Sequence, residues 1–233
     1  MATLREQYVS KMGKLRTPAV GERLVFSADG ALTAGEPGPW STAGHVTIRA
    51  LSANENTVFI EGERAFLVYD TKEKRYRDFF EVVGNDDVRG QCGIHGIGKK
   101  DREWFEKQKP VRIAVSFAGD PRAVLEKVLE LDEDLHWPPP KEAPSANKAA
   151  GVGRGVSARR VLWSPNPRYT DFAKRAQLQG TSILWVVIGP DGLVKDMRVQ
   201  RPLGLASTRR PWRQCGSGSS SPRRKTASPS RCK

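Results

Sequence analysis

Alternating apolar and polar positions predict a β-rich unit in the first part of the chain. Strands are expected at residues 23–27, 45–51, 57–61, 64–69 and 111–117. In the second of these strands Val46, Ile48 and Ala50 share one face. Glu61-Gly62-Glu63 separates two of the runs and favours a hairpin turn. The aromatic residues expected to fill the core are Trp40, Phe59, Phe66 and Tyr69.

Two helices are predicted after these strands. One covers residues 100–107. The other opens at Asp120-Pro121, because proline is favoured in the first turn of a helix. Its apolar stripe consists of Val124, Leu125, Val128, Leu129 and Leu131. We therefore expect an α+β protein whose N-terminal β-rich domain, with a late helix, spans residues 1–135.

Proline-rich and then glycine-rich composition predicts a linker over residues 136–160. Beyond it, within 161–205, a short helix is expected at 170–177, with Gly180 where a helix end favours a left-handed residue. Two β-rich runs follow, 181–188 and 193–201, joined by the turn sequence Gly-Pro-Asp-Gly. One helix and one hairpin are too little to hold a fold. We therefore expect the second half of this domain to be missing.

The stretch from Pro165 to Gly204 resembles the C-terminal domain of TonB, the energy transducer of bacterial outer-membrane transport. The resemblance rests on the order and spacing of short elements rather than on any one of them. The matching family-motif residues are Tyr169, Gly180, Val186, Asp191, Gly192, Val199 and Gly204. It implies an antiparallel sheet with helices on one face, incomplete in this chain.

The resemblance also implies a function without chemistry of its own. In the family, an inner-membrane complex of the ExbB–ExbD type, driven by the protonmotive force, pulls on this domain. The domain in turn binds an extended peptide of an outer-membrane receptor as an added strand. We therefore expect a periplasmic binding protein that is not an enzyme, with no cofactor, metal, nucleic acid or small-molecule substrate.

The residues after Gly204 depart from the family, which continues with a Leu-Asp stretch, an amphipathic helix, a Trp-x-Phe-x-Pro motif and a final strand. The printed tail, ASTRRPWRQCGSGSSSPRRKTASPSRCK, has no apolar period and no strand run. With suitable codons, reading it one base out of phase yields LDEKAVEAVRQWKFEP, which contains that motif. Our hypothesis is that one base was lost near Leu205, and we expect residues 206–233 to be a disordered, out-of-frame tail. Resequencing the gene across this point tests the hypothesis.

The net charge of +13 favours a nucleic-acid-binding protein as an alternative function. Much of the charge lies in the tail, where eight basic residues follow Ser207 without an acidic one; removing them leaves +5. The basic residues are Arg209, Arg210, Arg213, Arg223, Arg224, Lys225, Arg231 and Lys233. Two of the three cysteines, Cys215 and Cys232, also lie there, so that Cys92 alone supports neither a disulfide nor a zinc site. Loss of RNA retention on deletion of the tail would identify the nucleic-acid alternative. A second alternative function is that of an interaction protein of the cell envelope that transduces no energy.

TonB proteins normally carry an inner-membrane anchor at the N-terminus. Here the first residues, MATLREQYVSKMGKLRTP, have no apolar core, and no run of about 18 apolar residues occurs. We expect either that the start codon lies further upstream, which would add an anchor, or that this module is not coupled to the membrane in the usual way.

Several patterns suggest catalytic or ligand sites that we do not adopt. Residues 93–100 match the frame of a phosphate loop, but Lys100 stands where a Ser or Thr must hold magnesium. Cys92 and His95 could form a thiol–imidazole pair in an enzyme, which labelling of Cys92 by a thiol reagent at neutral pH would reveal. His45 and His136 have no partners at a suitable spacing, and the acidic run 130–134 is expected to be a solvated patch.

Overall fold

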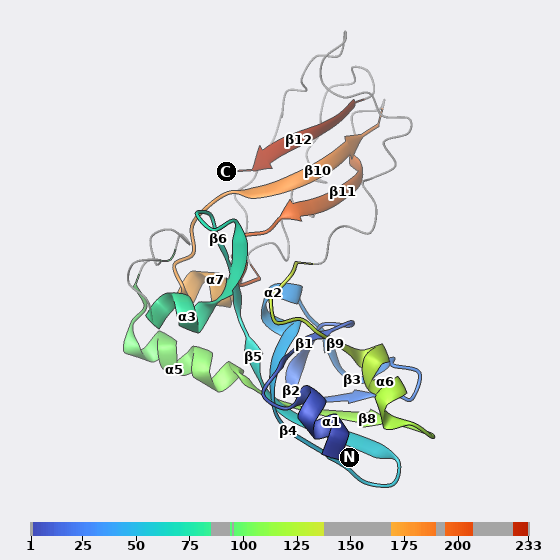
Figure 1. Ribbon diagram of the computed structural model, residues 1–233. Helices are drawn as coiled ribbons and strands as arrows, with labels where there is room; N and C mark the ends of the chain where they lie inside the picture. Colours follow the sequence, from blue (N-terminus) through green and yellow to red (C-terminus); the bar gives the residue numbers. More distant parts are fainter. Residues whose placement is uncertain are drawn as a thin grey trace.

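Figure 1 shows the computed structural model, which describes residues 2–84, 94, 96–137, 169–189, 194–206 and 226–232. The protein is mixed α+β with mostly strands. Its helices are α1 (Ala2–Tyr8), α2 (Trp40–Ala43), α3 (Phe79–Gly84), α5 (Lys99–Gln108), α6 (Pro121–Val128) and α7 (Asp171–Arg175). Its strands are β1 (Met12–Leu15), β2 (Ala19–Phe26), β3 (Leu32–Pro37), β4 (His45–Ala53), β5 (Thr57–Ala65), β6 (Leu67–Asp70), β7 (Arg75–Asp78), β8 (Pro110–Ser116), β9 (Leu129–Leu131), β10 (Ser182–Ile188), β11 (Val194–Arg201) and β12 (Thr226–Cys232).

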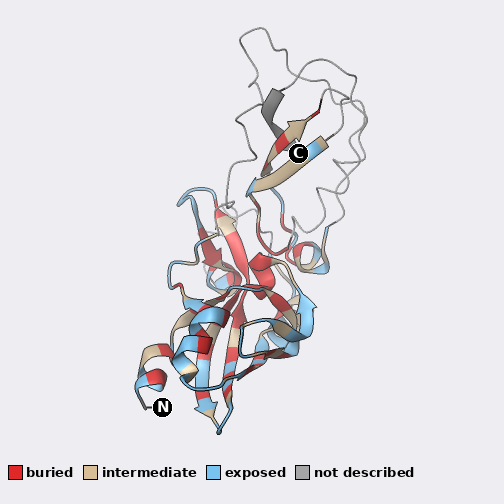
Figure 2. Cartoon of the chain, turned by 90° about the vertical axis from the view of Figure 1, so that its right-hand side faces the viewer, coloured by how far each residue is buried: buried red, intermediate tan, exposed pale blue. Residues whose placement is uncertain are grey.

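A curled seven-stranded sheet with the order β3-β2-β8-β5-β4-β1-β9 forms the first part of the protein. Its neighbouring strands are antiparallel except β2 and β8, which run parallel. Alternate strand residues such as Phe26, Ile48, Ile60 and Ile113 are buried beneath α1 and α6. Figure 2 shows this buried layer inside a more exposed outer surface. The core therefore lies on one face of the curled sheet.

The helix predictions and most strand predictions of the first part are confirmed. The helices are α5 and α6, and the strands at 23–27, 45–51 and 111–117 lie within or largely coincide with β2, β4 and β8. The Asp120 side chain caps α6 by accepting a hydrogen bond from the Arg122 backbone N–H. Leu129 and Leu131, which we assigned to the helical stripe, instead lie in β9. That part of the prediction is wrong because β9 pairs with β1 and so ends the helix at Val128.

The predicted hairpin turn at Gly62 is wrong, because β5 runs unbroken through it. The turn lies earlier, where the Asn54 side-chain oxygen accepts hydrogen bonds from the backbone N–H groups of Asn56 and Thr57. Gly62 lies opposite β4, and a Cβ there would stand 2.6 Å from the Thr47 carbonyl oxygen. Glycine at this position therefore allows two strands to approach closely and does not turn the chain.

A second buried cluster lies beside the sheet, between the β6–β7 hairpin and the helices α3 and α5. Its aromatic members include Phe66, Phe79 and Phe105, with Phe79 and Phe105 4.3 Å apart between ring centroids. Trp40 belongs to a third, smaller cluster. Phe59, which we placed in the core, is 41% exposed, because it occupies the outward-facing register of β5. The predicted core is thus divided between clusters and one of its residues lies outside them.

The predicted C-terminal hairpin is present, with β10 and β11 antiparallel in a three-stranded sheet of order β11-β10-β12. The preceding helix α7 is shorter than predicted and starts at a Thr170 cap. The expectation of a tail without a strand is wrong for Thr226–Cys232, which forms β12 and pairs antiparallel with β10. Strand pairing uses backbone N–H and C=O groups, so a segment without apolar alternation can still complete a sheet edge. The linker expected at 136–160 lies outside the described residues from 138 onward.

Candidate functional site

The hairpin carries several of the residues that matched the TonB pattern. Val186 in β10 is buried, and Val199 in β11 is half-buried and pairs in register with Leu184. Tyr169, before α7, is 40% exposed. Asp191 and Gly192 lie outside the described residues. The structure therefore brings Val186 and Val199 together in one sheet, while Tyr169 lies apart at the start of α7.

The predicted helix-ending role of Gly180 is wrong, because Gln177 with a φ of 48° provides the left-handed residue after α7. Gly180 has a φ of 151°, and a Cβ there would lie 2.7 Å from a methyl of Leu203. Its small size therefore matters for contact with the far end of the hairpin. The apolar residues Ile183, Trp185 and Val187 of β10 are half-buried in this sheet.

Gly204 lies where the segment after the hairpin pairs with the first part of the protein. It forms an antiparallel bridge with Val68 of β6. The Tyr69 N–H donates to the Leu203 carbonyl at 3.0 Å, and the Leu205 N–H donates to the Leu67 carbonyl at 2.7 Å. A Cβ on Gly204 would stand 2.1 Å from the Leu67 carbonyl oxygen, and its φ of 99° is one that glycine accepts readily. The segment after β11 therefore adds to the β6–β7 hairpin as a short strand.

Residues before and after this short strand make further polar contacts with the first part. The Tyr76 hydroxyl donates to the Pro202 carbonyl at 3.2 Å, and the Ala206 N–H donates to the buried Ser41 hydroxyl at 2.8 Å. Burial raises the pKa of Tyr76 above its ordinary range, which keeps its hydroxyl a donor. Each of these contacts joins residues that lie far apart in the sequence.

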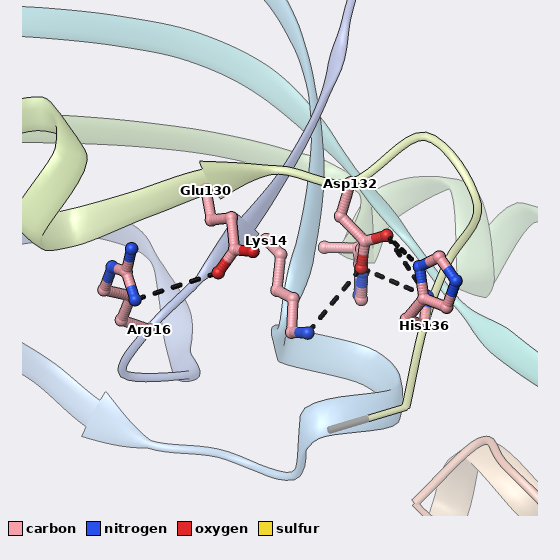
Figure 3. A network of polar contacts seen from close by, with 6 residues as sticks. Lys14, Arg16, Glu130, Asp132 and His136 are labelled. Atoms are coloured by element: carbon pink, nitrogen blue, oxygen red, sulfur yellow. Dashed lines mark hydrogen bonds and ion pairs between the residues drawn. The ribbon is translucent and has the colours of Figure 1, made fainter. Parts of the chain in front are cut away.

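A polar network centred on the buried Asp132 lies near the end of the first part (Figure 3). Its carboxylate bonds the His45 Nε2 at 2.9 Å and the His136 Nδ1 at 2.8 Å, and also accepts from the His136 backbone N–H. The Lys14 ammonium lies 3.8 Å away, and an Arg16–Glu130 ion pair flanks the network. The network therefore ties β9 and the residues after it to β1 and β4.

The electrostatics favour an ionised Asp132 and a neutral His45. Burial lowers the pKa of the His45 imidazole, against the opposing effect of its hydrogen bond to Asp132. Burial alone would raise the pKa of Asp132, but hydrogen bonds from His45 and His136 hold it below its ordinary value. Within the described part of the chain the His45 Nδ1 has no hydrogen-bond partner, which suits a lone pair better than a second N–H.

Sequence spacing did not predict this network, because His45 and Asp132 lie 87 positions apart. The expectation that the acidic run 130–134 is a solvated patch is wrong at Asp132, which is 8% exposed. The one available signal was the alternation of Leu129 and Leu131 with polar residues, which indicates a strand. The two imidazoles bond opposite oxygens of one carboxylate, and His45 is fully buried. The network therefore connects strands in the interior through His45 and Asp132, while the His136 side chain is exposed at the surface.

Other candidate chemistry gains no support from the described residues. No group of three His, Cys, Asp or Glu residues among them could hold a metal ion. Cys92, Gly93 and His95 lie outside the described residues, while Lys99 and Lys100 begin α5 with exposed side chains. Within the described part, none of the helices has the length and apolar character needed to cross a membrane.

Comparisons of the chain with protein-family models, curated protein sequences and solved structures found no match. The resemblance to TonB therefore rests on the residues quoted above.

Proposed function

We propose that this protein is a TonB-like periplasmic binding protein whose C-terminal sheet contacts outer-membrane receptors during energy-dependent transport. The observation that supports this most directly is the order helix, strand, strand over α7, β10 and β11, with the two strands joined as an antiparallel hairpin. Its partner is an extended receptor peptide, and an inner-membrane complex of the ExbB–ExbD type supplies the force. The function requires no catalytic residue, cofactor or metal.

Strand addition needs a sheet edge with unpaired backbone groups. In the three-stranded sheet the central strand is β10, so β11 and β12 each present an outer edge. Backbone groups dominate such binding, which explains why few side chains can be named as site residues. The resemblance assigns the receptor-binding edge to the family's final strand, which is encoded after Gly204 only in the corrected frame. The printed chain has the segment that forms β12 in place of these family residues, and so lacks that strand.

The printed chain and a chain with the corrected frame should therefore differ in binding. We expect the corrected chain to retain a synthetic peptide of an outer-membrane receptor, whereas the printed chain retains little or none. A pull-down with the immobilised peptide measures this. The control is the same peptide with proline at alternate positions, which removes backbone donors and abolishes strand addition. Equal retention by both chains, or unchanged retention of the proline peptide, refutes the proposal.

A further inference from the structure

We propose that the N-terminal unit is a dock that holds the base of the C-terminal hairpin, so that the two associate without help from the covalent link between them. The dock consists of the β6–β7 hairpin with α3 and α5, and its occupant is α7 together with residues 202–206. This inference goes beyond the proposed function and does not depend on what the C-terminal sheet binds. In this proposal the N-terminal unit holds the C-terminal sheet in position.

Backbone hydrogen bonds form one set of contacts between the dock and its occupant. Residues 203–205 pair with 67–69 by hydrogen bonds of 3.0 and 2.7 Å around the Val68–Gly204 bridge. The Thr170 hydroxyl, at the start of α7, donates to the Leu205 carbonyl at 3.0 Å. Leu205 itself is completely buried. The hydrogen bond from Thr170 to Leu205 therefore links α7 to the short strand, and both contact the dock together.

Packing of aromatic side chains forms a second set of contacts between the dock and its occupant. Phe172 of α7 lies 5.3 Å from Phe66 and 4.9 Å from Trp104 between ring centroids. Ala173, Ala176 and Leu178 are buried in the same cluster. Figure 1 shows α7 beside α3 and α5, close to the β6–β7 hairpin. Together with Ala176, Leu178 and Leu205, the apolar side of α7 thus completes a cluster whose remaining buried members come from the first part of the chain.

Charged side chains fix the orientation of α7 at the rim of the dock. The Arg175 guanidinium lies 2.9 Å from the Asp101 carboxylate and 4.6 Å from the centroid of Trp104. At the other end, the Arg201 guanidinium lies 5.2 Å from the centroid of Tyr69. Arg175 and Arg201 therefore each have an anion or an aromatic face of the dock as a partner.

The two ends of the stretch 138–168 both lie against this assembly. Trp137 stacks on Tyr76 at 5.6 Å, and Tyr76 in turn donates to Pro202. On the far side of the stretch, Thr170 is bonded to Leu205. Residues on both sides of the stretch 138–168 thus contact the same part of the structure. A cut within this stretch breaks none of the contacts that form the dock.

The test is proteolysis of the full chain carrying a protease recognition sequence inserted between Lys148 and Ala149. After cleavage, we expect the two fragments to co-elute in size-exclusion chromatography at micromolar concentration. Gly204→Ala places a Cβ against the Leu67 carbonyl, and Phe172→Ala removes the ring from the cluster. Each should weaken association of the fragments about tenfold or more, a loss readily measured by titrating the re-mixed fragments.

Gln200→Ala is the matched control, because it shortens an exposed side chain of β11 that lies in the C-terminal fragment and outside the dock and its occupant. Both test substitutions lie in the C-terminal fragment, so the N-terminal unit folds as before. Amide hydrogen exchange of the uncut chain gives a second readout: Gly204→Ala should expose the Tyr69 and Leu205 N–H groups while β4 and β5 keep their protection. Separation of the unmodified fragments, or association of the test variants as tight as that of Gln200→Ala, overturns the proposal.

Discussion

At the scale of single residues, Asp132 and Gly204 each join segments that are distant in sequence, and they do so by different means. Asp132 acts through charge, since its carboxylate bonds His45 and His136 and lies near Lys14. Gly204 acts through the absence of a side chain, which lets the backbone reach Leu67. The contacts of Asp132 with His45 and of Gly204 with Leu67 join residues far apart in the sequence, so neither contact belongs to a local motif.

The buried His45 should make folding stability depend on pH. Its lowered pKa means that the unfolded chain binds a proton more readily than the folded one. The stability that this neutral histidine contributes is therefore complete above about pH 6.5, the ordinary histidine pKa, and is lost as the pH falls through the lower folded value. Urea unfolding at pH 7.5 and at pH 5.5 should show lower stability at the acidic pH. His45→Asn should lower stability at both pH values and reduce the difference between them; an unchanged difference would contradict this account.

At the scale of elements, close approach of two strands explains why β5 continues through a sequence that favours a turn. A Cβ at Gly62 would meet both the Thr47 carbonyl and a Val46 methyl at 2.6 Å. The register of β4 and β5 shifts between Ile48 and Ala50, beside this contact. Glycine often ends a strand, but at Gly62 it allows the strand to continue, because β4 lies close against it.

Gly62→Ala should consequently destabilise the N-terminal sheet, by about 1–3 kcal/mol for a side chain inserted without space. Denaturant unfolding followed by far-ultraviolet circular dichroism measures the change. Phe59→Thr, an exposed change in the same strand that puts a strand-favouring β-branched residue in place of the aromatic one, should alter the free energy of unfolding by about 0.5 kcal/mol or less. Equal effects of the two substitutions would show that the contact at Gly62 is not tight.

At the scale of the whole molecule, one aromatic cluster unites residues from both sides of the stretch 138–168. Phe105 is fully buried and lies within 6 Å of the ring centroids of Phe66, Phe79 and Phe172. The first two rings come from the N-terminal unit and the third from α7. A cluster shared in this way couples the stability of the dock to that of its occupant.

Phe105→Ala should therefore destabilise the protein by about 3–5 kcal/mol and loosen α7 together with α3. Amide hydrogen exchange should show protection lost in both helices at once. Phe117→Ala provides a comparison, because Phe117 is only partly buried and packs against the other core cluster. Loss of protection in α3 alone, with α7 unaffected, would show that the shared cluster does not couple them.

The sequence by itself determined most of the elements and little of their assembly. Apolar alternation located β2, β4, β8, β10 and β11, and the Asp120-Pro121 pair located α6, because periodicity and capping are local properties. It also supplied the resemblance to TonB and the hypothesis of a lost base near Leu205, neither of which needs coordinates.

Only the tertiary structure decided which residues meet. The role of Gly62 and the partners of Asp132 both depend on strands that local pattern cannot place beside one another. The position of the segment after β11 depends in the same way on the β6 edge, where Gly204 admits the backbone of another strand. Long-range contacts of this kind are set by packing of the complete chain, which is why the hairpin was foreseen and its dock was not.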